Sequence, residues 1–227
     1  MKLEKQNRHA MASAIYRKAI VIDMLNASAY SKDYLNQVAG AGFTSVVCTL
    51  RGKGFRDLIG SIWEWYLLFE YSQGKVLLAD TAQDIEKAKE GGKLAVVFGL
   101  QNGAPLEGDL RLLRILRRLG LSVIQLTYNE ENELGGGCTA PEDRGLTSFG
   151  RQVVGEMNRL GMVIDLSHCG HATTMETIKR SKDPVIFSHT NPRSLCDNPR
   201  NKTDEAIKAL AEKGGVMGVC AWAPIAW

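Results

Sequence analysis

Two histidines, His168 and His189, each stand at the end of a short apolar run that is typical of a buried β-strand. The runs cover residues 162–168 and 184–189, and a serine precedes each histidine. In parallel α/β folds the reactive side chains lie at the C-terminal ends of strands, where loops form a site. Neutral imidazole is also the commonest protein ligand for zinc-like metals. The pattern therefore predicts a metal site shared by two strand ends, with isolated strand-capping histidines as the alternative.

Seven apolar runs with little alternation predict strands that are buried on both faces, as in a parallel sheet. They cover residues 19–23, 44–49, 94–99, 122–128, 162–168, 184–189 and 215–221. Helical periodicity between them predicts helices at residues 81–90, 106–119, 148–160 and 203–213. The aromatic-rich segment 62–69 predicts a further helix packed on the sheet, or instead the lining of a pocket mouth.

The alternation of strands and helices favours an α/β fold of the (β/α)8 TIM-barrel type, with an open doubly wound sheet as the alternative. No glycine-rich phosphate fingerprint follows the first strand. A barrel needs eight strands, and the sequence accounts for about seven. We therefore expect a single (β/α) barrel domain over residues 1–227, incomplete at its C-terminus. An uncovered edge at residues 215–221 would favour homo-oligomers.

Composition and charge argue against two classes of partner, nucleic acids and membranes. The 227 residues are 44% hydrophobic and 23% charged, with a net charge of +3, which does not indicate nucleic-acid binding. The densest basic group is expected to form the solvated face of one helix and comprises Arg111, Arg114, Arg117 and Arg118. The N-terminus lacks the apolar stretch of a secretory signal, and no run reaches the ~20 apolar residues that cross a bilayer. We expect no membrane partner.

The cysteines indicate a compartment. Five cysteines without a CxxC pair argue against a disulfide framework and favour a reducing environment, so the expected location is cytoplasmic. Cys138 lies in a glycine-rich loop and Cys169 follows His168 directly. Either thiol could be a soft metal ligand or a reactive group, or simply an ordinary loop cysteine.

The second half of the chain resembles the renal (membrane) dipeptidase family, peptidase family M19, whose members are metallopeptidases on an amidohydrolase-like barrel. The resemblance depends on the motifs DLSH at 165–168, FSH at 187–189 and CDNPRN at 196–201, together with segments 145–154 and 209–215. It implies that His168 and His189 bind one zinc ion. It also implies that Arg200 binds the substrate carboxylate, which a guanidinium fork matches in a bidentate manner.

Several positions depart from the family pattern. Leu25 and Ala27 stand where the family has the first-strand ligands of a second metal, and Gln101 replaces the glutamate that bridges both metals. A neutral amide does not supply the charge that holds two dications close together. Tyr128 replaces a substrate-contacting histidine. The departures imply a degenerate site with one zinc ion or none.

These observations give a working hypothesis for function. We expect a membrane-dipeptidase-like metallohydrolase that cleaves a dipeptide or a related small amide with metal-activated water. Tyr128 and Gln101 are the candidate catalytic residues, and Arg200, Tyr128 and Asn129 are the candidate substrate-binding residues. Tyr128 would donate a proton or stabilise an oxyanion, or serve only as a structural hydrogen-bond partner. Because the resemblance puts a further catalytic aspartate beyond residue 227, we expect activity to be weak or absent. The alternatives are a non-catalytic small-molecule binding protein and an inactive truncated homologue.

Overall fold

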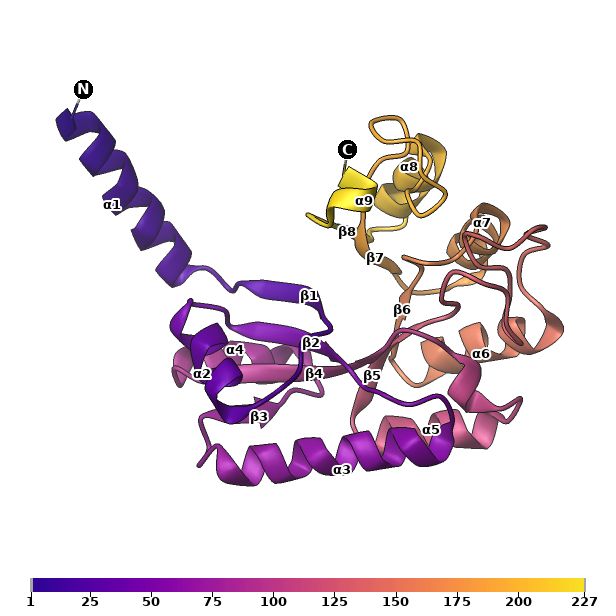
Figure 1. Cartoon of the computed structure of the whole chain (residues 1–227), viewed down its shortest axis with the longest axis horizontal. Helices are drawn as coiled ribbons and strands as arrows, with labels where there is room; N and C mark the ends of the chain where they lie inside the picture. The colour runs from indigo at the N-terminus through magenta and orange to yellow at the C-terminus, as the bar shows by residue number, and fades with distance from the viewer. Residues whose placement is uncertain (1, 227) are drawn as a thin grey trace.

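Eight parallel strands form one sheet that curls into a nearly closed barrel (Figure 1). This computed structural model describes residues 2–226, with side chains for residue 8 and residues 10–226. Seven strands follow one another in the order β1-β2-β4-β5-β6-β7-β8, and β3 pairs with β4 alongside that path. The strands are β1 (Ile22–Asn26), β2 (Ser45–Thr49), β3 (Val76–Leu78), β4 (Leu94–Leu100), β5 (Leu121–Gln125), β6 (Val163–Asp165), β7 (Ile186–Thr190) and β8 (Val216–Val219).

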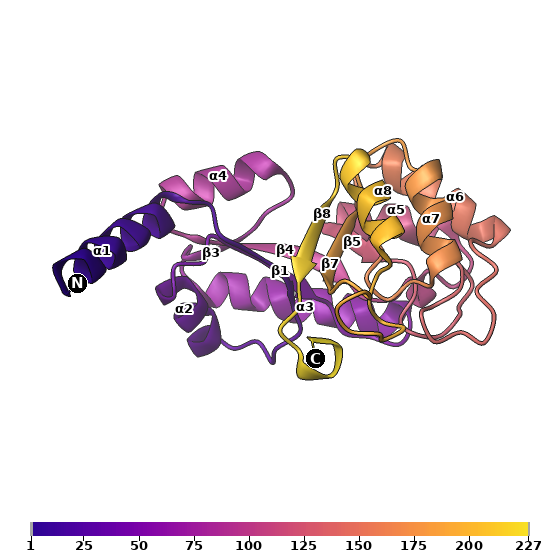
Figure 2. The same cartoon turned by 90° about the horizontal axis from the view of Figure 1, so that it is seen from above.

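Helices connect the strands and lie on the outside of the curved sheet (Figures 1 and 2). They are α1 (Lys2–Lys18), α2 (Lys32–Gly40), α3 (Phe55–Tyr71), α4 (Ala82–Glu90), α5 (Leu110–Arg118), α6 (Ser148–Arg159), α7 (His171–Arg180), α8 (Asp204–Glu212) and α9 (Ala223–Ala226), with the 3-10 helix η1 at Ala104–Leu106. Figure 2 shows α5 to α8 gathered beside the C-terminal strands. Helix α1 projects away from the sheet.

The core forms where the helices press on the strands. Helix α3 covers β4 through Trp65 and Phe69, whose rings lie 5.9 Å from the ring of Phe98. Ile62 and Trp65 are buried, as expected for a helix packed on the barrel. Helix α4 begins with the capping box that Thr81 and Asp84 form with the backbone of its first turn. The predicted fold class is confirmed.

Two strands differ from the sequence-based expectations, and helices α1, α2 and α7 were not among the predicted elements. The first strand was placed at residues 19–23, but β1 covers Ile22–Asn26, because helix α1 continues to Lys18 and pairing begins with Ile22 opposite Ser45. Strand β3 was missed; it has only three residues, which pair with the first half of β4. Too few residues alternate or repeat in so short a segment to reveal it.

The two ends of the sheet path present apolar side chains to solvent. No ladder joins β1 to β8 within the part of the chain that the structure describes. Val219 of β8 is 83% exposed, and Ile22 of β1 is 42% exposed. Exposed edges of this kind are pairing templates, so the expected self-association of the chain stays a prediction about this edge.

Two glycines of α6 offer a test of the packing. An added Cβ at Gly150 would lie 1.9 Å from the backbone oxygen of Leu134, whereas one at Gly155 meets nothing within 4 Å. We expect Gly150→Ala to lower the free energy of unfolding by about 1–3 kcal/mol through overpacking. Gly155→Ala should raise it by about 0.5–1 kcal/mol, because alanine is the better helix former. Denaturant midpoints measure both effects, and equal midpoints would contradict the packing described.

Candidate functional site

The ends of β6 and β7 bring the two imidazoles together. His168 follows β6 in the loop towards α7, and His189 is the last residue but one of strand β7. Their Nε2 atoms are 2.9 Å apart, and the ring centroids are 4.9 Å apart. His168 is buried and His189 is partly buried. The two Nε2 atoms therefore face each other at the C-terminal end of the barrel, where parallel barrels carry their sites.

A polar partner holds the other nitrogen of each ring. His168 Nδ1 lies 2.6 Å from Asn129 Oδ1, which accepts a hydrogen bond and has no proton to give. His189 Nδ1 lies 2.7 Å from Ser188 Oγ. The Ser188 hydroxyl donates to Asp165 Oδ2, so it accepts from His189 Nδ1. Each ring thus carries its proton on Nδ1, and two Nε2 lone pairs face each other.

Asp165 is the buried carboxylate beneath this arrangement. Its Oδ1 accepts from the backbone N–H and the hydroxyl of Ser167 and from the backbone N–H of Ser188. The side chain is 2% exposed. These hydrogen bonds satisfy a charge that would otherwise be costly to bury, and they fix the serine that orients His189.

Burial keeps both imidazoles neutral. Desolvation lowers the pKa of His189 to about 4, while the nearby Asp165 charge partly opposes the shift and Arg200 reinforces it. Desolvation, followed by the Arg200 charge, lowers the pKa of His168 still further. At neutral pH both rings are therefore uncharged and can offer lone pairs to a cation.

The donor set fits one metal ion better than two. Zinc–nitrogen bonds of ~2.0–2.1 Å in a tetrahedral site put two nitrogens ~3.3 Å apart, so the 2.9 Å separation needs only a small opening. The Gln101 amide, with Nε2 3.4 Å from His189 Nε2, offers its oxygen after a flip. Across residues 2–226 no group of three or more His, Cys, Asp or Glu side chains converges on a metal position. Among the described residues, no carboxylate forms a hydrogen bond with either imidazole, so the charge that a second dication needs is not supplied there.

Tyr128 and Asn129 follow β5 and flank His168. The Tyr128 ring stacks on the His168 ring with centroids 4.2 Å apart and planes at 19°, and its side chain is 46% exposed. Asn129 has a left-handed backbone with φ of 61°, and its side chain contacts the far nitrogen of His168. Tyr128 can therefore reach a ligand from the rim, whereas Asn129 orients an imidazole from behind.

Arg200 is buried beside the pair. Its guanidinium donates to the backbone oxygen of Ser167 and, at 2.8 Å, to that of His189. A guanidinium has five N–H donors, so these two contacts leave donors for a ligand carboxylate. Its role in substrate binding stays a prediction, and the observed contacts tie it to both strand ends.

The sequence interpretation missed three of the supporting residues. Ser188 and Asp165 orient His189, and the serine before each histidine was the available signal. Lys202 is buried, and its Nζ donates to the backbone oxygen of Cys169 at 2.6 Å and to Thr174 Oγ1 at 3.1 Å. Burial lowers the pKa of Lys202 to about 8. Nothing in the sequence pattern distinguished this lysine from a surface lysine.

Cys138 and Cys169, which the sequence analysis singled out, lie close to the histidine pair. Cys138 Sγ lies 3.5 Å from Asn129 Oδ1, and Cys169 is fully buried between the site and Lys202. Burial raises the pKa of both thiols, so both are protonated and poorly nucleophilic at neutral pH. This favours the interpretation of ordinary packed cysteines.

The chain matches a family model over nearly its whole length. Residues 12–225 match the model of membrane dipeptidase, peptidase family M19. The chain belongs to the membrane dipeptidase family. Dipeptidase 3 of Rattus norvegicus is 40% identical over 133 residues, which are 56% of this chain and 27% of that protein. An uncharacterized dipeptidase of Schizosaccharomyces pombe is 36% identical over 145 residues, 62% of this chain and 35% of that protein.

A solved structure extends the comparison to three dimensions. An amidohydrolase from Pseudomonas aeruginosa superposes with a TM-score of 0.90 at 36% identity, covering 94% of this chain and 66% of that one. The matched regions thus span about a quarter to a third of the two curated dipeptidases and about two thirds of this amidohydrolase. None of the helices in residues 2–226 is long and apolar enough to cross a membrane.

The neutral histidine pair predicts a pH dependence of stability. The unfolded chain takes up protons at these histidines below pH 6.5, whereas the folded protein resists uptake until about pH 4 at His189 and lower at His168. The free energy of unfolding of the metal-free protein should therefore fall as the pH drops below 6.5, by at most about 1.4 kcal/mol per pH unit for each histidine. Above pH 6.5 the pair adds no pH dependence.

Urea unfolding at pH 7 and pH 5 checks this slope. The variant His189→Gln lacks one of the two proton acceptors, so it should lose less stability than the wild type between these values. If the variant loses as much as the wild type, the histidine pair is not the source of the dependence.

Proposed function

We propose that this chain is a dipeptidase-like hydrolase that cleaves a dipeptide or a related small amide at a site holding one zinc ion. The observation that carries the proposal is the pair of Nε2 lone pairs of His168 and His189, which face each other at 2.9 Å with both Nδ1 protons engaged elsewhere. Two acceptor nitrogens at this distance repel each other, and a shared cation would remove the repulsion. Membership of a dipeptidase family supports the substrate class.

Different residues of the chain would bind the metal ion, bind the substrate and orient the imidazoles. A bound zinc ion would polarise the scissile carbonyl and lower the pKa of a water molecule to about 7. Arg200 holds the free carboxylate of the substrate through donors that its backbone contacts leave over. Tyr128 forms the wall above the His168 ring, and its hydroxyl donates to the substrate carbonyl oxygen. Asn129 and Ser188 keep the imidazole lone pairs pointed inward.

Proton transfer is the weak step of this scheme. Gln101 is neutral at the position nearest His189, and an amide cannot take a proton from attacking water. General-base catalysis typically contributes 10²–10⁴-fold, so we expect slow hydrolysis. The same observation favours a second candidate function, a non-catalytic binding protein that retains the small-molecule pocket. The two candidates differ in turnover and not in binding.

Metal content tests the proposal first. Protein purified without chelators should hold about one zinc equivalent, and His168→Ala or His189→Ala should remove it. His171→Ala is the matched control, because His171 lies on α7 with Nε2 3.5 Å from Glu205 and outside the pair. A panel of dipeptides should show zinc-dependent hydrolysis that His189→Ala abolishes. Dipeptide binding without hydrolysis would support the second candidate, and zinc retained by both variants would overturn the assigned site.

Placing a negative charge at Gln101 tests whether this residue adjoins the metal ion. Gln101→Glu places a carboxylate next to the pair and should raise zinc affinity by about tenfold or more, since ~1.4 kcal/mol of added attraction gives that factor. Gln152→Glu on the exposed surface of α6 adds the same charge away from the site and should leave the affinity unchanged. Zinc titration against a chelating indicator measures both. Equal affinities in the two variants would show that Gln101 does not adjoin the ion.

A further inference from the structure

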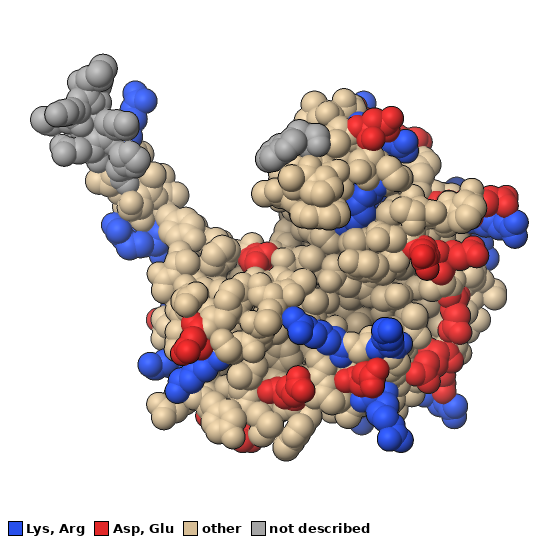
Figure 3. Space-filling model, viewed as in Figure 1, with Lys and Arg blue, Asp and Glu red and all other residues tan. Residues whose placement is uncertain are grey.

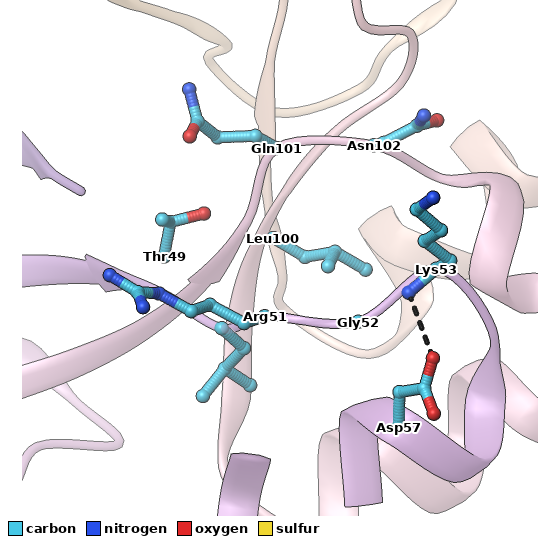
Figure 4. Close-up of a pocket in the computed structure, with 9 residues that line it drawn as sticks. Thr49, Arg51, Gly52, Lys53, Asp57, Leu100, Gln101 and Asn102 are labelled. Carbon is cyan, nitrogen blue, oxygen red and sulfur yellow. Dashed lines mark hydrogen bonds between the residues drawn. The ribbon is translucent and has the colours of Figure 1, made fainter. Parts of the chain in front are cut away.

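A cavity lies beside the histidine pair at the C-terminal ends of β2 and β4 (Figure 4). It has a volume of about 500 Å³, which is in the range of small-molecule sites. Thr49, Arg51 and Lys53 line it from the β2 side, and Gln101 and Asn102 line it from the β4 side. Gln101 also contacts His189, with 3.4 Å between the two Nε2 atoms. The cavity therefore shares a wall with the proposed reaction site.

Hydrogen-bond donors dominate this cavity. The Arg51 guanidinium donates one N–H group to the backbone oxygen of Ser28, at 3.1 Å, and its other N–H groups have no hydrogen-bond partner among the described residues. Asn102 Oδ1 accepts from Ala104 N and Asn132 Nδ2, so the amide group of Asn102 is left as a donor. Figure 4 shows Lys53 reaching toward Asn102. Three donor groups, two of them charged, thus line this space, with Arg51 at one side of it and Lys53 and Asn102 at the other (Figure 4).

The nearby carboxylates serve the backbone and not the two cations. Asp57 Oδ2 accepts from the backbone N–H of Lys53 at 3.3 Å, as the dashed line in Figure 4 marks, and Glu107 Oε1 accepts from Phe55 N at 2.9 Å. Within residues 2–226, neither Arg51 nor Lys53 forms an ion pair with either of them. In the space-filling view, Lys and Arg side chains lie interspersed with Asp and Glu side chains over this face (Figure 3). The cavity wall carries two cations against one carboxylate, Asp57.

We propose that this cavity binds a carboxylate side chain of the substrate, so that the preferred ligands are dipeptides with an acidic N-terminal residue. The proposal rests on the proposed function, in which Arg200 takes the terminal carboxylate. Arg200 contacts the ends of β6 and β7, whereas the cavity lies at the ends of β2 and β4, with His189 and Gln101 between them. A dipeptide held by Arg200 across the histidine pair therefore directs its N-terminal side chain toward Arg51 and Lys53.

Two dipeptides of equal size, one with a charged side chain and one with a neutral side chain, separate the effect of charge on affinity from the effect of shape. Calorimetry on the full chain at low ionic strength should give Glu-Ala an affinity about fivefold higher than Gln-Ala, because an exposed pair contributes up to ~1 kcal/mol. The preference should shrink as salt is added. The double variant Arg51→Gln/Lys53→Gln should bind both dipeptides equally. The charge-matched control Arg118→Gln/Lys75→Gln changes exposed residues at the opposite end of the barrel and should keep the preference.

The outcomes distinguish this proposal from the proposed function. Equal binding of both dipeptides by the wild type, or a preference that survives in the double variant, overturns the carboxylate-binding role of the cavity and leaves the dipeptidase proposal standing. If neither dipeptide binds, the dipeptidase proposal fails, and glutarate then tests the cavity alone. Glutarate binding that the double variant loses supports a carboxylate site, and no glutarate binding to the wild type overturns it.

Discussion

The Asp165 carboxylate is the constraint on which the site depends. Strands β6 and β7 share a ladder with a single registered pair, Asp165 opposite Ile186, so few backbone contacts hold them together. The Asp165 side chain adds hydrogen bonds from both of the strand-end serines, Ser167 and Ser188. A buried carboxylate with several strong donors is worth more than a neutral contact, because losing a partner leaves an uncompensated charge.

The same carboxylate sets the electrostatic character of the interior. Two buried cations, Arg200 and Lys202, lie close to the histidine pair, and Asp165 is the buried carboxylate that faces them. Burial is the main cause of the lowered pKa of both imidazoles, and the two cations reinforce it, whereas Asp165 opposes it at His189. The excess of buried positive charge disfavours a second dication. It also favours ligands that bring negative charge with them. The site of this family member is therefore organised around neutral imidazoles and cationic donors, in keeping with the amide at Gln101.

Periodicity and strand-end chemistry predicted much of this architecture. The apolar runs located the strands of the barrel path, apart from a shift at β1, and the two strand-end histidines do converge. The roles of the supporting polar residues could not be predicted, because the direction of a serine hydroxyl depends on the stagger between strands. Asn129 shows the same limit: its left-handed backbone turns its amide to His168, a contact that the sequence did not indicate. Its expected contact with substrate stays a prediction.

The segment between β5 and α6 builds one wall of the site without regular secondary structure. Close backbone contacts at glycines fix it: a Cβ at Gly137 would lie 2.0 Å from the Asn129 oxygen, and one at Gly150 would lie 1.9 Å from the Leu134 oxygen. Positions that tolerate no side chain thus hold the backbone beside the histidines in place. Residues 130–133 and 139–142 lie mostly toward solvent. Mutational drift, or a designed library, can reshape the rim there and leave the imidazoles where they are. The rim of the site and the imidazole pair can therefore change independently of each other in evolution.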